Sequence, residues 1–137
     1  MKMKGLLLIV AFCVSAQGAD EMSLMKFKAT NDCQGCDLIG ANLNRFVEIV
    51  GDQGAKLIGT NLTNANLKHA DLEGAKLFLA NLDGADLTKA NLEGANLLRA
   101  NLRGANLEGA KLKDVSGLDK AKLCKTIMPW GEDNSGC

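Results

Sequence analysis

The chain has 137 residues, and its 16 lysine and arginine residues are balanced by 16 aspartate and glutamate residues. This length is typical of one domain or at most two. The neutral balance argues against a general nucleic-acid binder, which would be basic, and against an acidic mimic of DNA, which needs a large field of one sign. Aromatic residues make up only 4% of the chain and there is one histidine, so we expect a core of leucine and alanine and no multi-histidine metal site.

Residues 1–19 are predicted to be a secretory signal peptide. Lys2 and Lys4 precede the uncharged run 5–16, and small residues follow up to Ala19. This is the order of the basic, apolar and cleavage regions of such peptides, and the apolar run is shorter than the roughly 20 residues that span a bilayer. We place cleavage after Ala19, with Ala16 as the alternative. The mature chain is then exported, periplasmic or secreted, without a transmembrane segment, and its net charge falls by two to −2.

The middle of the chain repeats every five residues, with twelve consecutive pentapeptides at 55–114. Alanine lies two residues before the central leucine in eleven of the twelve, and the residue directly before the leucine is Asn seven times, Asp twice and Lys three times. Internal periodicity of this kind indicates a repeat architecture. The central leucines, which we predict to form the core, are Leu57, Leu62, Leu67, Leu72, Leu77, Leu82, Leu87, Leu92, Leu97, Leu102, Leu107 and Leu112.

Neither a helix nor a straight strand buries a leucine at every fifth position. Five helical residues turn the chain by about 500°, so successive leucines would be spread around the helix. In a strand an odd period sends successive leucines to opposite faces. A chain that bends at every repeat keeps all leucines inside, and its stacked coils pair as parallel strands about 4.8 Å apart.

Two longer recurrences indicate four sides per coil. Apolar residues follow the central leucine at Ile58, Phe78 and Leu98, which lie twenty residues apart, and glycine recurs every ten residues from Gly74 to Gly104. Glycine suits corners because it accepts a positive φ. We expect the Asn and Asp side chains before the leucines to bond to nearby backbone groups that a bent chain leaves unpaired.

The A-N/D-L-x-x repeats resemble the pentapeptide-repeat family, which forms a right-handed quadrilateral parallel β-helix. We therefore predict an all-β fold of about four coils, in which the β-helix spans 36–123, regular repeats span 55–114 and an irregular segment spans 46–54. The column should be roughly 20 Å tall.

A solenoid needs caps, because its ends expose strand edges and the apolar core. We assign the N-terminal cap to 20–35, with a short helix after Ser23, and the C-terminal cap to 124–137. The C-terminal cap should contain a β-turn from Met128 to Gly131, with Trp130 over the end of the core. A CxxC before the repeats and a C-terminal Cys…MPxG…Cys segment are similar to exported members of the family.

Four cysteines remain after signal-peptide removal, and an even number in an exported chain favours disulfides. Disulfides need Cα atoms within about 6.8 Å, so cysteines at opposite ends of the column cannot pair. This leaves Cys33–Cys36 and Cys124–Cys137, a disulfide-closed C-terminal cap, and argues against a four-cysteine zinc site. The alternative for Cys33 and Cys36 is a redox-active pair, which usually lies at a helix N-terminus; we favour a structural bridge and no free thiol in the mature chain.

One outward strip is apolar. Ile39, Ile58, Phe78 and Leu98 should stack on a single side with Leu79 beside them, while the matching places on the other sides are polar. A coherent apolar strip on a polar surface is typical of an interface, so we predict that it binds a second copy, as a homodimer, or an exported protein. The alternative is that a cap or the irregular segment covers it.

These residues predict a noncatalytic exported structural or protein-interaction module rather than an enzyme. We find no catalytic constellation, cofactor motif or metal-ligand set, and we expect no nucleic acid or small-molecule substrate as a partner. Two alternatives stay open: a topoisomerase-protecting DNA mimic, an activity known in the family but opposed by the signal peptide and the neutral charge, and a thiol-redox protein using Cys33 and Cys36.

Overall fold

The structure is a computed structural model, and residues 55–137 are described from it. The predictions made for the signal peptide, the N-terminal cap, the Cys33–Cys36 pair, Ile39 and the segment 46–54 lie outside these residues.

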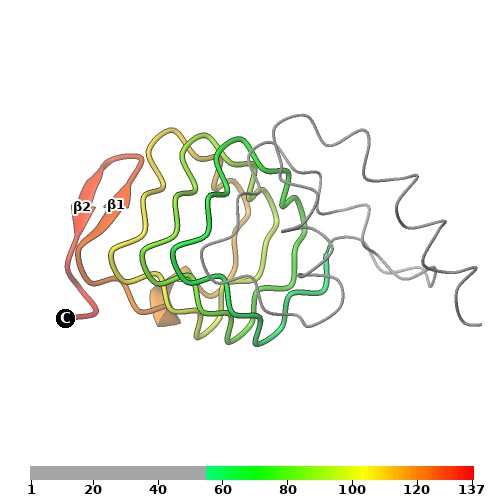
Figure 1. The fold of residues 1–137 in the computed structure, drawn as a ribbon, viewed down its shortest axis with the longest axis horizontal. Coiled ribbons are helices and arrows are strands. Elements are labelled where there is room, and N and C mark those ends of the chain that lie inside the picture. Colours follow the sequence, from blue (N-terminus) through cyan, green and yellow to red (C-terminus); the bar gives the residue numbers. More distant parts are fainter. Residues whose placement is uncertain (1–54) are drawn as a thin grey trace, which may run out of the picture.

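The repeats wind into coils in which one residue of each repeat is bridged, in the regular part, to the residue 20 positions further on. Parallel bridges join Lys56 to Lys76, Lys76 to Asn96 and Asn96 to Ser116. Since four pentapeptides separate the paired residues, each coil has four sides, and residues 56–116 complete three coils of a parallel β-helix. Figure 1 shows these coils stacked side by side, with the C-terminal hairpin at one end.

The four sides follow one another along the chain, and we name three of them after their first bridged residue. The sides are the apolar side (55–59, 75–79, 95–99), the Asn61 side (60–64, 80–84, 100–104), the Asn66 side (65–69, 85–89, 105–109) and the Asp71 side (70–74, 90–94, 110–114).

Backbone hydrogen bonds link each side to the same side of the next coil. On the apolar side the Leu57 N–H donates to the Lys76 carbonyl at 3.0 Å, the Gly59 N–H to the Phe78 carbonyl at 2.9 Å, and the Lys76 N–H to the Ala55 carbonyl at 2.8 Å. Similar bonds recur on the other sides. The strands stay short because a turn follows every central leucine, and this turn is closed in the first repeat by a bond from the Thr60 N–H to the Leu57 carbonyl at 3.2 Å.

The corners require a left-handed backbone at the second residue after each leucine. Gly74 and Gly94 take φ values of 65° and 67° on one side, and Gly84 and Gly104 take 66° and 63° on the opposite side. The predicted corner role of these glycines is confirmed. The same conformation is also held by residues with side chains, despite its cost for L-residues. Within the regular coils they are Asn64, His69, Leu79, Lys89, Arg99 and Asp114, and Lys125 follows in the cap.

The Asn and Asp side chains that precede the leucines stabilise the corners, as predicted. The Asn61 Oδ1 accepts a hydrogen bond from the backbone N–H of Thr63 at 3.2 Å, which is an Asx turn. All nine Asn and Asp residues at this position accept the corresponding bond two residues on. Some of these amides also link coils, since the Asn101 Nδ2 donates to the Asn81 Oδ1 at 3.0 Å.

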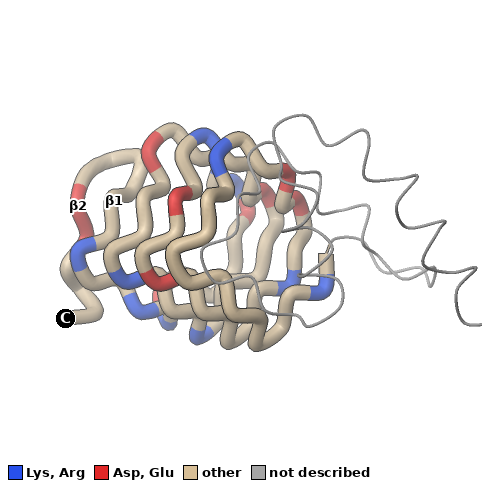
Figure 2. The backbone as a smooth tube through the Cα atoms, in the orientation of Figure 1, with Lys and Arg blue, Asp and Glu red and all other residues tan. Residues whose placement is uncertain are grey.

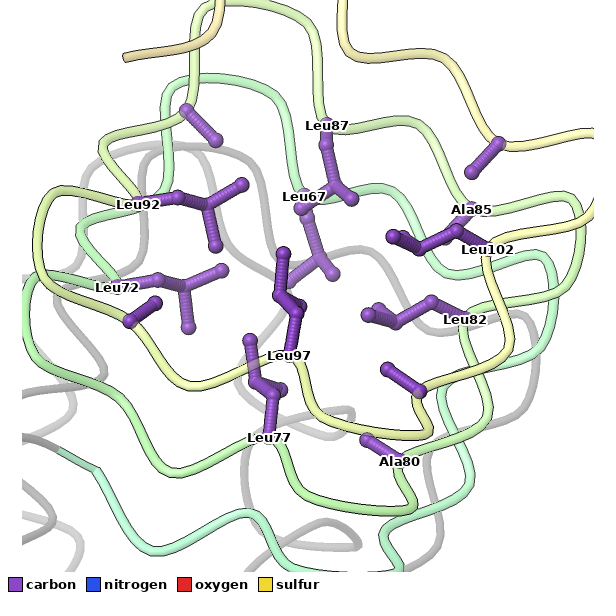
Figure 3. Packing of buried hydrophobic residues seen from close by; sticks show 14 of the residues in the cluster. Leu67, Leu72, Leu77, Ala80, Leu82, Ala85, Leu87, Leu92, Leu97 and Leu102 are labelled. Atoms are coloured by element: carbon purple, nitrogen blue, oxygen red, sulfur yellow. The ribbon is translucent and has the colours of Figure 1, made fainter. Parts of the chain in front are cut away.

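The core is a stack of leucine layers lined by alanine. The central leucines from Leu57 to Leu107 are buried, whereas Leu112 is only partly buried where the regular coils end. Figure 3 shows leucines of four successive repeats pointing inward, with the next coil repeating the arrangement above them. Thr60, the one exception to alanine at its position, is also buried.

The last coil contains one extra residue. Asn101 bridges to Lys122 and Asn106 to Ile127, so the separation rises from 20 to 21 residues. The change follows the short 3-10 helix η2, Leu118–Lys120. Two strands then form an antiparallel hairpin, β1 (Thr126–Met128) and β2 (Gly131–Asp133). Because the Ile127 N–H donates to the Ala105 carbonyl at 2.9 Å, β1 continues the ladder of the Asn66 side.

The hairpin closes the end of the core, but the predicted role of Trp130 is wrong. The predicted β-turn joins β1 to β2 through Pro129 and Trp130. Trp130 is 67% exposed, whereas Met128 is 1% exposed and packs in the core cluster. The reason is the alternation along β1: Met128 points inward with Thr126, and the turn carries the next two residues away from the column.

Candidate protein-interaction surface

The apolar side carries three stacked hydrophobic side chains. Its bridges place 56, 76 and 96 in register, and the Leu79 N–H donates to the Leu98 carbonyl at 3.1 Å. Ile58, Phe78 and Leu98 each follow an inward leucine by one residue and therefore lie above one another. This is the stacking predicted from their spacing; their part in binding stays a prediction.

The strip combines half-exposed and partly buried side chains. Ile58 is 52% exposed and Leu79, at the corner beside it, is 50% exposed. Phe78 and Leu98 are partly buried, as expected for side chains that pack against their neighbours about 4.8 Å away along the stack. Exposed apolar area of this kind favours contact with a complementary surface.

Only positive charges flank the strip within the three coils. Lys56 and Lys76 lie at bridged positions and Arg99 at a corner, and the apolar side has no Asp or Glu among residues 55–59, 75–79 and 95–99. Asp119 follows above this side in η2 and pairs with Lys120 at 3.4 Å. The apolar side is thus basic as well as hydrophobic.

The matching outward positions on the other three described sides are polar. They are Thr63, Asp83, Arg103, Lys68, Thr88, Glu108, Glu73, Glu93 and Lys113. Figure 2 shows residues of both charge signs distributed over the coils. The difference between the apolar side and these three is the main asymmetry of the column.

Acidic groups on the polar sides support the fold. Lys68 and Asp86 form an ion pair at 3.3 Å across adjacent coils. Burial raises the pKa of Asp86, but hydrogen bonds from the hydroxyl and backbone N–H of Thr88, together with Lys68, outweigh burial and leave the pKa below its usual value. The Asn91 Nδ2 donates to Asp71 at 3.4 Å and to Glu73 at 3.3 Å. These contacts stabilise stacked coils and form no pair poised for acid–base catalysis.

Residues 55–137 contain no group of three His, Cys, Asp or Glu side chains placed to hold a metal ion. His69 is exposed at a corner of the Asn66 side. Over the same residues, no helix is both long and apolar enough to cross a membrane.

A disulfide fastens the C-terminal cap, as predicted. Cys124 and Cys137 are bonded, with their Cα atoms 4.8 Å apart and 13 positions apart in sequence. The Lys125 N–H donates to the Asn134 side chain at 2.9 Å and the Gly136 N–H to the Leu123 carbonyl at 3.1 Å. The tail is therefore held against the last coil.

The hairpin carries a second exposed apolar group that the repeat pattern did not reveal. Ile127 is 43% exposed on β1, and Trp130 is exposed at the turn. Glu132 lies directly opposite Ile127 in the hairpin register, so the two side chains share one face. The two-residue alternation Thr126-Ile127-Met128 is the signal that would have placed Ile127 outward.

Comparison with known proteins gives one consistent family. The family model described as pentapeptide repeats matches residues 53–82 and 80–116 with eight copies. No curated protein matches the chain.

Solved structures with sequence similarity are pentapeptide-repeat proteins. One from the thylakoid lumen of Arabidopsis thaliana is 29% identical, with 78% of this chain and 73% of that chain covered and a TM-score of 0.47. Rfr23 from the cyanobacterium Cyanothece 51142 is 31% identical, with 72% and 95% covered and a TM-score of 0.38. A protein from Nostoc PCC 7120 is 37% identical, with 67% and 74% covered and a TM-score of 0.38. Because these TM-scores are below 0.5, the similarity of this chain to these proteins rests on the match to the repeat family and on the sequence identity.

Proposed function

We propose that this chain, which belongs to the pentapeptide-repeat family, is an exported, noncatalytic module that binds protein through its apolar side. The observation that carries the proposal is the asymmetry of the column. Ile58, Phe78, Leu79 and Leu98 form one apolar strip, whereas the matching places on the other described sides are polar. Contiguous apolar patches on otherwise polar proteins mark interaction sites.

The β-helix suits a binding module because backbone hydrogen bonds join its coils on every described side. A protein surface that changes little on association loses little conformational entropy there. The left-handed corners, together with the Asx turn at Asn96, fix the backbone that carries the strip. The proposal assigns no cofactor, metal, nucleic acid or small-molecule substrate to the chain.

Export rests on two observations of different kinds. The sequence of residues 1–19 is typical of a signal peptide, and disulfides such as Cys124–Cys137 persist in oxidising compartments. The proposal also includes the right-handed winding of the family and a total of about four coils.

The proposal predicts that Phe78→Glu abolishes association and leaves the fold intact. A carboxylate at the centre of the strip would have to be desolvated in any apolar contact, which is unfavourable. A photo-crosslinking amino acid at Ile58, which is half exposed, reports the contact in cells that export the chain. We expect a protein adduct in the parent chain and none when Phe78→Glu is added.

Arg103→Glu is the matched control, because Arg103 occupies the equivalent exposed position on the Asn61 side. It should leave the adduct unchanged, and circular dichroism should show both variants folded. The proposal fails if position 58 yields no protein adduct, or if the adduct survives Phe78→Glu.

A further inference from the structure

We infer that the apolar side binds the C-terminal hairpin of a second copy of this chain. This inference rests on the proposed function and names the partner of the same surface. In the described residues, the exposed large hydrophobic side chains are Ile58, Leu79, Ile127 and Trp130. They fall into two groups, one on the apolar side and one on the hairpin, so each group can cover the other.

The two groups carry opposite flanking charge. Lys56 and Arg99 are exposed beside the apolar strip, with Lys76 between them in the stack. The hairpin segment 125–133 holds Glu132 and Asp133 on β2 against a single cation, Lys125. Figure 2 shows acidic residues on β2 at the C-terminal end of the column. Opposite potentials on two surfaces favour their encounter and fix their register.

One acidic side chain of the hairpin, Glu132, shares a face with the exposed Ile127, whereas Asp133 lies opposite the inward-facing Thr126. Glu132 faces Ile127 across the hairpin, and Glu108 belongs to the coil to which β1 is bridged, two residues after Asn106. Hydrogen bonds hold the acids in place, since Asn134 Nδ2 donates to Glu132 at 2.9 Å and the Ser135 N–H to Asp133 at 2.8 Å. Trp130 projects at the turn, and tryptophan is enriched among residues that dominate binding energy.

A symmetric contact between two apolar sides fits the charges poorly. In a two-fold dimer the same patch occurs on both copies, so Lys56, Lys76 and Arg99 of each copy would meet three coils whose apolar side has no acidic residue. Like charges brought together across an interface are unfavourable. The Asp71 side offers carboxylates but no large apolar side chain at its outward positions. The hairpin is the described surface that supplies both.

A bilayer is a weaker fit than a protein surface. Membrane-bound faces bury their apolar side chains some 5–10 Å below the headgroups. Here Phe78 and Leu98 are partly buried within the stack, which leaves Ile58 and Leu79 as the exposed large apolar side chains of this side.

The test uses two variants that each destroy one half of the contact. The mature oxidised chain (residues 20–137) should show a light-scattering mass above that of one chain, rising with concentration and falling with salt. Phe78→Glu and Trp130→Glu should each return the mass to that of one chain. Mixed in equal amounts, they should form a pair with twice that mass and no larger species, because only one intact apolar side and one intact hairpin remain. Arg103→Glu should associate like the parent.

Four results would overturn the inference. The parent chain staying at the mass of one chain would exclude self-association and leave the proposed function to its crosslinking test. Self-association that is insensitive to Trp130→Glu would indicate contact between apolar sides. Failure of the mixed variants to pair would show that the two surfaces do not bind one another. Binding of the parent chain to anionic phosphatidylserine vesicles that Phe78→Glu abolishes, without self-association, would instead identify a membrane as the occupant.

Discussion

Leu82→Ala is expected to lower the free energy of unfolding by about 2–5 kcal/mol. Leu82 is fully buried in the central coil, between the leucines of the adjacent coils on the same side, as Figure 3 shows for Leu102. The backbone on each side is hydrogen-bonded to its neighbours, so it cannot collapse far into the space that the side chain leaves. Denaturant unfolding of the oxidised chain measures the loss.

Leu79→Ala is the matched control for this prediction. It makes the same change at a leucine that is half exposed and only three positions earlier, and surface substitutions usually alter stability by about 0.5 kcal/mol or less. Equal losses in the two variants would contradict the assignment of inward and outward leucines.

Loss of the Cys124–Cys137 bridge is expected to cost about 3 kcal/mol, the chain-entropy value for a loop of roughly 15 residues. The bridge spans 13 positions and encloses both strands of the hairpin. Cys137→Ser removes it at an exposed position, so the buried Cys124 and the core are left in place. Denaturant unfolding without reductant compares this variant with the parent.

The loss should be concentrated in the cap. Repeat proteins are stabilised mainly by contacts between neighbouring repeats, so amide hydrogen exchange should accelerate in β1 and β2 while the coil at 75–94 stays protected. An unchanged free energy of unfolding, or equal acceleration along the whole column, would refute this role for the bridge.

The regular coils were predictable because each repeat contains the residues that determine its own bend and its own inward side chains. The period of five excludes a helix and a straight strand, and the recurrences at twenty and ten residues give the number of sides. The Asx turns follow from the Asn or Asp before each leucine, since the bond reaches only two residues along the chain. All of this depends on local chemistry that the sequence repeats many times.

The C-terminal cap was harder to predict because nothing in it repeats. The extra residue between Ser116 and Lys122 changes the register of the last coil. Residue type alone favours a buried position for a tryptophan near the end of the core. Trp130 lies at the turn and Met128 in the core because of the strand alternation in β1. The opposite charge of the two exposed apolar groups emerges only once β2 has been placed beside β1.

The central claim is that the apolar side binds the C-terminal hairpin of a second copy. Its most direct test is the NMR spectrum of the ¹⁵N-labelled Trp130→Glu chain, titrated with unlabelled Phe78→Glu chain. Amide shift changes are expected at 56–59, 76–79 and 96–99, a spacing of 20 residues that belongs to one side of the coil. Changes on the Asn61, Asn66 or Asp71 side instead, or no changes on the apolar side, would contradict it.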